Sequence, residues 1–317
     1  MIATLLLLLL TTDPTAGERL LPRIPLADFT GTEARALDDY LGQVLLVDFF
    51  AHWCAACARQ VPHRNDLVEA FGGQGLNVLG VTGDDAPTAA EWLKRLEASY
   101  PHARDAELAL QIELGFRPLP FAVLVDPCGV IVWQGNPADL PVERIEELLE
   151  GALALPAHRW PAAARPVREA LRARKYAEAE RLSSSSPGQG AEIAKLVARI
   201  TARRGELLEA ALAAQDFLGA DELAAELEAG LADGRLRSRA TAVRAEIAAK
   251  GDARVVLAAQ RELRELWNGV GAVASVQQAD ALASQIRALS GAHSGTQVER
   301  SAGAYLDTIS ALKTVLR

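Results

Sequence analysis

Two of the three cysteines in this 317-residue chain, Cys54 and Cys57, are separated only by Ala55 and Ala56. If a helix begins here, Cys54 lies at its N-terminus and Cys57 lies one turn further on, on the same face. The unpaired N–H groups and the positive end of the helix dipole would then stabilise the thiolate form of Cys54. We therefore predict that Cys54 attacks a disulfide, and that the less exposed Cys57 attacks the mixed disulfide and releases the partner.

A Cys-x-x-Cys pair also occurs in zinc sites, but such a site needs about two further ligands. His52 and His63 are near the pair in sequence, yet the chain has no second Cys-x-x-Cys motif and no suitably spaced pair of histidines. The sequence therefore favours a redox pair over a metal site. We expect neither a metal ion nor a cofactor.

The elements that must position this pair alternate between strands and helices. Residues 43–50 form an apolar, β-branched run that is typical of a buried strand. From Cys54 to about Phe71 the composition is that of a helix, which Gly72 and Gly73 would end. The same patterns predict a strand over 76–81, a helix over 86–100, a hairpin of 121–125 with 130–133, and a closing helix over 142–153.

A change of composition divides the chain. After the closing helix, aromatic residues become rare and Ala, Arg, Glu and Leu dominate. We predict a leader over 1–16, an α/β domain over 17–152, a linker over 153–164 and an all-helical domain over 165–317.

Within the helical region, breaks are expected near Gly205, Gly230 and Gly251, and a loop is expected over 183–190. Residues 172–182 look like part of a helical hairpin of tetratricopeptide type. Possible echoes of this segment recur at unequal intervals, so the sequence does not establish a fixed repeat.

The residues around the cysteine pair resemble a known family. Residues 47–57 (VDFFAHWCAAC) resemble the signature of the thioredoxin superfamily. Pro62, five residues after Cys57, matches the proline that kinks the family's active-site helix, and Pro120 matches its cis-proline. The start of the domain, the apolar leader and the turn of the predicted hairpin are most similar to the bacterial extracytoplasmic TlpA-like reductases. The resemblance covers residues 24–152 and implies a thioredoxin-like α/β fold, with a central mixed sheet flanked by helices.

The resemblance also implies a redox-active disulfide between Cys54 and Cys57, and a surrounding active-site surface. Ala55 and Ala56 replace the Gly-Pro of thioredoxins, and this dipeptide helps to set the reduction potential, so reductase versus oxidase stays open. The other positions that match the site are Trp53, Leu119 and Pro120.

Asp48 precedes Cys54 by six residues and matches the buried acid of thioredoxins, which is thought to exchange a proton with the second cysteine. Burial raises the pKa of a carboxyl group, which would suit Asp48 to accept the proton of Cys57. The alternative is that Asp48 only forms hydrogen bonds in the core.

The net charge of the chain restricts its possible partners, and the apolar leader indicates its compartment. The net charge of -8 and the pI near 5.3 argue against nucleic acid as a partner. Residues 1–10 resemble the apolar part of a secretory signal, although no Lys or Arg precedes the apolar run. We expect an extracytoplasmic protein, in the bacterial periplasm, and the alternative is a cytoplasmic one.

The third cysteine, Cys128, follows the predicted strand 121–125, which should start beside the active site and run away from it. At about 3.3 Å per residue, Cys128 would lie roughly 20 Å from the pair. An inert, half-buried thiol is expected, and an intermolecular disulfide is a minor alternative.

Two functions fit these observations. The first is an enzyme, a thiol–disulfide oxidoreductase that acts on client proteins with disulfides or thiols and depends on an unidentified electron donor. The resemblance favours a reductase over an oxidase. The second is an interaction protein, in which the helical domain binds a protein partner and redox activity is secondary.

Overall fold

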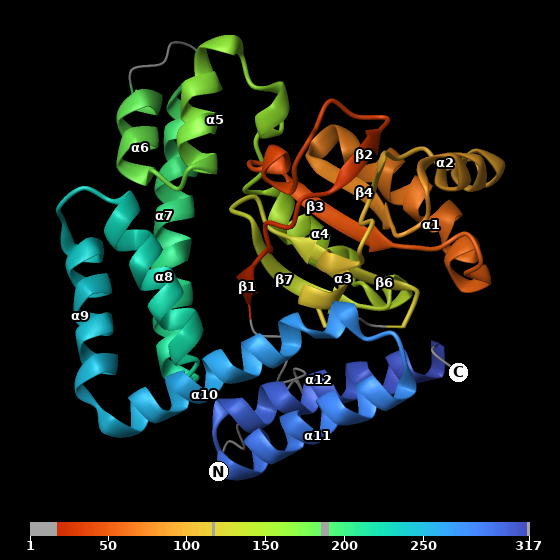
Figure 1. Ribbon diagram of the computed structural model, residues 1–317. Helices are drawn as coiled ribbons and strands as arrows, with labels where there is room; N and C mark the ends of the chain where they lie inside the picture. The colour runs from red at the N-terminus through yellow and green to blue at the C-terminus, as the bar shows by residue number, and fades with distance from the viewer. Residues whose placement is uncertain (1–17, 116–117, 185–189, 316–317) are drawn as a thin grey trace, which may run out of the picture.

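The computed structural model describes residues 18–115, 118–184 and 190–315 of the chain. The predicted leader lies outside these residues, and so does most of the loop predicted over 183–190. Within the described residues, an α/β domain is followed by a region of helices and loops (Figure 1). Both parts of the predicted fold class are confirmed.

The described part of the α/β domain contains a seven-stranded sheet in the order β1-β7-β6-β3-β4-β5-β2. Strands β3, β4 and β5 run parallel, whereas β6 pairs antiparallel with both β3 and β7. The short strands β1 and β2 pair antiparallel with β7 and β5 at the two edges. The strands are β1 (Arg19–Leu20), β2 (Ala27–Thr30), β3 (Val44–Phe49), β4 (Leu76–Thr82), β5 (His102–Arg104), β6 (Phe121–Val125) and β7 (Val130–Gly135).

Strand β3 lies at the centre of the sheet, and its alternate side chains face two apolar cores. Val44 and Leu46 pack with helices α1, α2 and α4, whereas Leu45 and Val47 pack with α3 on the opposite face. Because side chains alternate along a strand, Asp48 points to the same face as Leu46, toward α1. The helices of the domain are α1 (Ala55–Phe71), α2 (Ala86–Arg95), α3 (Ala109–Glu113) and α4 (Val142–Leu149).

Two predicted helices are shorter in the structure. Helix α2 was expected to reach Tyr100, but the backbone is left-handed at Glu97, where φ is 54°. The chain therefore leaves the helix, and the ring of Tyr100 enters the core. Helix α4 ends at Leu149 rather than at residue 153.

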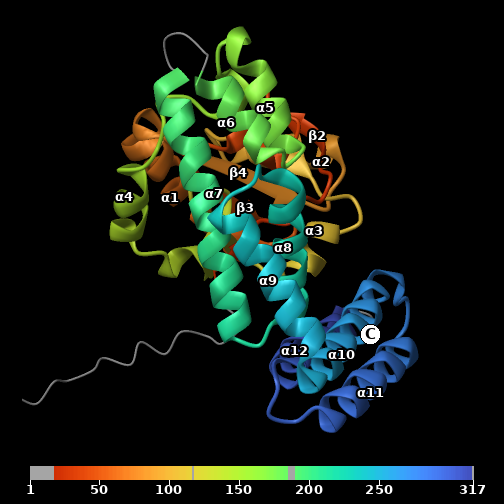
Figure 2. The ribbon, with the colours of Figure 1, turned by 90° about the vertical axis from the view of Figure 1, so that its left-hand side faces the viewer.

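The helical region has two cores. Helices α5 to α9 share one core, which also takes in Ala253 at the start of α10, and α10, α11 and α12 form a second bundle with its own core that follows on from α9 (Figures 1 and 2). Helix lengths vary from 8 residues in α5 to 24 in α7, so they show no fixed repeat. The helices are α5 (Arg165–Arg172), α6 (Tyr176–Ser184), α7 (Gly190–Ala213), α8 (Phe217–Gly230), α9 (Arg235–Ala249), α10 (Gly251–Asn268), α11 (Val276–Ala292) and α12 (Gln297–Val315).

One predicted break is wrong. Gly230 ends α8 and Gly251 begins α10, but Gly205 lies inside α7. A Cβ atom at position 205 would lie 3.0 Å from Cδ1 of Leu236 in α9. The glycine therefore permits close helix packing at this point, which outweighs its poor helix propensity.

The segment expected as a linker, residues 153–164, connects the two regions but is packed rather than free. The backbone N–H of Leu153 donates to the carbonyl oxygen of Gly42 at 2.6 Å. Ala157, Trp160 and Ala164 are buried in the same core as helices α5 to α9. The first helical core thus extends onto the α/β domain.

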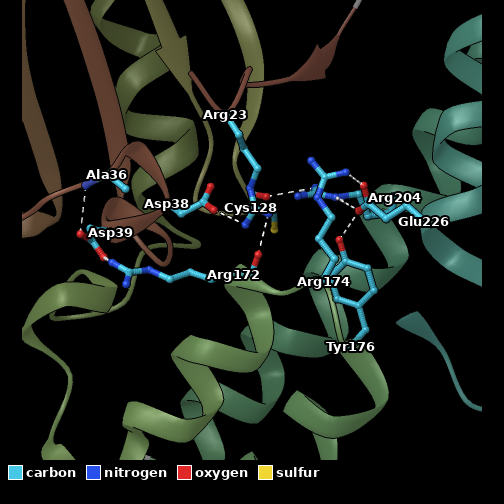
Figure 3. Close-up of polar contacts among 10 residues, drawn as sticks. All are labelled: Arg23, Ala36, Asp38, Asp39, Cys128, Arg172, Arg174, Tyr176, Arg204 and Glu226. Atoms are coloured by element: carbon cyan, nitrogen blue, oxygen red, sulfur yellow. Dashed lines mark hydrogen bonds and ion pairs between the residues drawn. The ribbon is translucent and has the colours of Figure 1, made fainter. Parts of the chain in front are cut away.

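Charged groups hold the two regions together (Figure 3). Arg172 of α5 pairs with the buried carboxylate of Asp39. Arg23 pairs with Asp38 and also donates to the carbonyl oxygen of Arg172 at 2.6 Å. Arg204 of α7 donates to the carbonyl oxygen of Cys128 at 3.1 Å. These contacts fix helices α5 and α7 against the α/β domain.

Candidate active site

The cysteine pair lies at the junction between the central strand and helix α1. Cys54 caps the N-terminus of α1, and its sulfur accepts a hydrogen bond from the backbone N–H of Cys57 at 3.1 Å. The two sulfurs form a disulfide with an S–S distance of 2.07 Å and a Cα–Cα distance of 5.3 Å. Pro62 lies inside α1. The Sγ atom of Cys54 is therefore placed at the helix N–H groups, which would stabilise a thiolate in the reduced protein.

The two cysteines do not differ in exposure as expected. Cys54 and Cys57 are each 5% exposed, and both belong to the apolar core under α1. The reason is that the disulfide brings the Cys54 side chain into that core beside Cys57. The distinction between them is instead positional, because Cys54 is the capping residue and Cys57 lies in the first turn.

The residues expected around the pair lie near it in two groups. Trp53 is 70% exposed, and Ala55 and Ala56 follow on the first turn of α1. Leu119 packs against the core that contains both cysteines, and the peptide bond between Leu119 and Pro120 is cis. Pro120 directly precedes strand β6, which pairs with β3. The sheet thereby brings a segment distant in sequence to the cysteine pair.

Asp48 is buried below the helix that carries the cysteines. Burial raises the pKa of its carboxyl group to about 6, although the nearby Arg64 guanidinium lowers it in part. Nη2 of Arg64 donates to Oδ1 of Asp48 at 3.3 Å. A carboxyl group with such a pKa can exchange a proton near neutral pH.

Arg64 is the component of the site that the sequence did not indicate. Its side chain is fully buried, and its guanidinium also donates to Oε1 of Gln60 at 2.7 Å. Residues 57, 60 and 64 are spaced at three and four along α1, so they share one helix face. In the sequence, only this spacing could have indicated Arg64, because it places a cation on the helix face that carries Cys57. A buried arginine is uncommon without a paired acid, and Asp48 is that acid.

The titration of Asp48 predicts a pH-dependent stability. The pKa of Asp48 is about 6 in the folded protein and 3.8 in the unfolded chain, so the folded protein holds the proton more tightly. The contribution of Asp48 to the free energy of unfolding is therefore fully present below pH 3.8 and is lost as the pH rises through 6. Between pH 4 and 8, the oxidised wild type should lose about 2 kcal/mol of unfolding free energy relative to Asp48→Asn. Urea denaturation of both proteins across this range measures the difference. A difference that does not change with pH would contradict the raised pKa.

The two histidines considered as zinc ligands are near the pair in sequence, and one of them has a clear structural role. Nδ1 of His52 lies 2.8 Å from Oδ1 of Asp84, and the backbone N–H of His52 donates to Oδ2 of the same carboxylate at 2.7 Å. This carboxylate therefore fixes the loop before Trp53. In the described part of the chain, no group of three or more His, Cys, Asp or Glu side chains is placed to hold a metal ion.

Cys128 is more buried than expected. It lies in the core shared with helices α5 to α9, and burial, with a smaller effect of Asp126, raises the pKa of its thiol to about 11. A thiol with this pKa is almost entirely protonated at neutral pH and is a poor nucleophile.

A family model described as the AhpC/TSA family matches residues 19–134 of the chain. The matched segment contains the central strand, the cysteine pair and the strand that follows Pro120. The site and this match resemble those of thioredoxin-superfamily domains of the TlpA-like thiol–disulfide oxidoreductase class.

The chain is similar to two curated relatives, both called thiol-disulfide oxidoreductase ResA. The relative from Geobacillus thermodenitrificans is 30% identical over 111 residues, which are 35% of this chain and 63% of the relative. The relative from Bacillus thuringiensis is 25% identical over 130 residues, which are 41% of this chain and 74% of the relative. The chain therefore spans less than two thirds of the first relative, and each match covers less than half of this chain.

Among solved structures, the chain is similar to a putative thiol:disulfide interchange protein DsbE from Chlorobium tepidum. The sequences are 26% identical, the match covers 41% of this chain and 95% of that protein, and the TM-score is 0.38.

Proposed function

We propose that this protein is a thiol–disulfide oxidoreductase that reduces disulfides in client proteins through Cys54 and Cys57. The observation that carries the proposal is the position of Cys54, whose sulfur caps α1 and accepts the N–H of Cys57. The thiol–disulfide oxidoreductases among the relatives support the same chemistry. The resemblance to reductases favours reduction as the direction.

In the proposed reaction, the reduced enzyme begins with the Cys54 thiolate. It attacks one sulfur of the client disulfide, so that a bond from Cys54 to the client forms and the client S–S bond breaks. The first client thiolate leaves and takes up a proton. Cys57 then loses its proton to Asp48 and attacks Sγ of Cys54, which expels the second client thiolate. The client gains two electrons, and the enzyme ends as the disulfide seen in the structure.

A dithiol donor must reduce this disulfide before the next turnover, and the donor's identity is open. We further propose that the reaction takes place outside the cytoplasm, in the periplasm, where client disulfides persist. The apolar run over residues 1–10 and the resemblance to extracytoplasmic reductases support this location. None of the helices in the described part of the chain is long and apolar enough to cross a membrane.

The proposal is tested by insulin reduction with dithiothreitol as the donor. The full-length protein should accelerate the precipitation of the insulin B chain, and a variant with both Cys54→Ser and Cys57→Ser should give the uncatalysed rate. A scaffold with no redox role would show no difference between the two proteins. The scaffold alternative is not favoured, because binding a client does not require a closed cysteine pair at a helix N-terminus.

A further inference from the structure

The last three helices contact the α/β domain at helix α3 and at Gly115. We call α10, α11 and α12 the C-terminal bundle. In its core, the rings of Trp267 and Tyr305 stack with centroids 4.0 Å apart. The bundle lies beside helix α3, and the side chain of Ile112 from α3 packs against its apolar core (Figure 1).

Two buried side chains of the bundle donate hydrogen bonds to main-chain carbonyl groups of the α/β domain. Nε1 of Trp267, on α10, donates to the carbonyl oxygen of Ile112 at 3.2 Å. Oγ1 of Thr308, on α12, lies 2.7 Å from the carbonyl oxygen of Gly115 and 3.0 Å from the carbonyl oxygen of Ala304 in its own helix, and the Gly115 contact is the shorter of the two. The two side chains belong to residues that are 1% and 5% exposed, so water does not readily replace either hydrogen bond.

Helix α3 is consequently held from both sides. Leu110 and Leu114 pack into the core of the sheet, whereas Ile112 packs into the core of the bundle. The carboxylate of Asp105 accepts the backbone N–H groups of Leu110 and Gln111 at 3.2 and 3.1 Å. A helix of five residues has little stability of its own, so its position depends on these contacts.

Gly115 and Leu119 are four positions apart in the sequence. Gly115 has a φ of 94°, a conformation that favours glycine, and turns the chain out of α3. Four residues further on, Leu119 packs against the core that contains Cys54 and Cys57. The carbonyl group bound by Thr308 thus belongs to a residue four positions before Leu119, whose side chain packs beside the cysteine pair.

We propose that the C-terminal bundle positions the Leu119 side of the active site, and that Thr308 and Trp267 are the positioning residues. The inference rests on the proposed function, and it gives the bundle a role in presenting the site to clients. A protein client must fit against Leu119 as well as react with Cys54. A small disulfide substrate needs only to reach the sulfur of Cys54. Loss of these hydrogen bonds should therefore impair reactions with proteins selectively.

The test is Thr308→Val in the full-length protein, with Thr308→Ser as the variant that keeps the hydroxyl group. Thr201→Val is the matched control, because Oγ1 of Thr201 donates to the carbonyl oxygen of Val197 in its own helix. Thr308→Val should lower kcat/KM for insulin about fivefold, mainly through KM, since it removes one buried hydrogen bond. Its rate with a small aromatic disulfide should stay at the wild-type value, as should both rates of Thr308→Ser and Thr201→Val.

A second variant covers the case in which Thr308→Val does not fold. Trp267→Phe keeps an aromatic ring against Tyr305 but removes the N–H that donates to Ile112. It should show the same selective loss with insulin, together with faster amide hydrogen exchange at 112–115 and at Leu119 and unchanged exchange in α1. Equal activity of both variants and wild type with insulin, or equal loss with both substrates, would overturn the inference. Failure of the wild type itself to reduce insulin would overturn the proposed function instead.

Discussion

Cys57→Ser should accumulate covalent complexes between Cys54 and its clients, and its turnover should fall by about a thousandfold or more. In the wild type, Cys57 lies one helical turn from Cys54, at an effective concentration far above that of any thiol in solution. Serine has nearly the same size but cannot form a disulfide, so the mixed disulfide persists until an outside thiol attacks it. Non-reducing gel electrophoresis followed by mass spectrometry detects these complexes, and a reductant should release the client.

Two cysteine variants serve as controls. Cys54→Ser should trap nothing and should have no activity, because it lacks the attacking thiolate. Cys128→Ser should behave as wild type, because the Cys128 thiol is buried and its raised pKa keeps it protonated. Trapping by Cys54→Ser but not by Cys57→Ser would reverse the roles that we assign to the two residues.

Asp48→Asn should slow the second step of the reaction about a hundredfold at pH 7, which is the lower end of the range for a lost general base. The reason is that the introduced amide cannot accept the proton of Cys57, whereas the carboxyl group of Asp48 is ionised above its pKa of about 6. The first attack by Cys54 should change much less. At about pH 9 the two proteins should converge, because hydroxide then removes the proton directly. Rapid mixing of reduced enzyme with a disulfide substrate, followed by acid quenching, resolves the two steps.

Asp126→Asn is the matched control for this substitution. Asp126 is also a buried acid with a pKa raised by burial, but it follows the far end of strand β6 from Pro120. Its replacement should leave the rate of the second step unchanged. Equal slowing by both variants, or equal slowing of both steps by Asp48→Asn, would favour a purely structural role for Asp48.

The sequence predicts those parts of the molecule that depend on local patterns. The apolar run that forms β3, the helix after Cys54 and the alternation that turns Asp48 toward α1 are all readable within a few residues. The short strands β1 and β5 escape prediction, because segments of two or three residues become strands only through the strand beside them.

Other features depend on contacts between distant segments. The ion pair of Arg64 with Asp48 exists because α1 packs on β3, and neither residue alone indicates the other. The bond from Thr308 to Gly115 joins residues 193 positions apart. Gly205 shows the same limitation, because its tolerance inside α7 depends on Leu236 of another helix.

The most direct test of the account is a single transfer of electrons without any added reductant. The enzyme is reduced, freed of the reducing agent and mixed with an equimolar amount of insulin, and the thiols of both proteins are then counted by alkylation and mass spectrometry. We predict that each insulin disulfide opened is matched by one new Cys54–Cys57 disulfide, while Cys128 remains a thiol. No transfer, or transfer that oxidises Cys128 instead of the pair, would contradict the assignment of Cys54 and Cys57 as the redox centre.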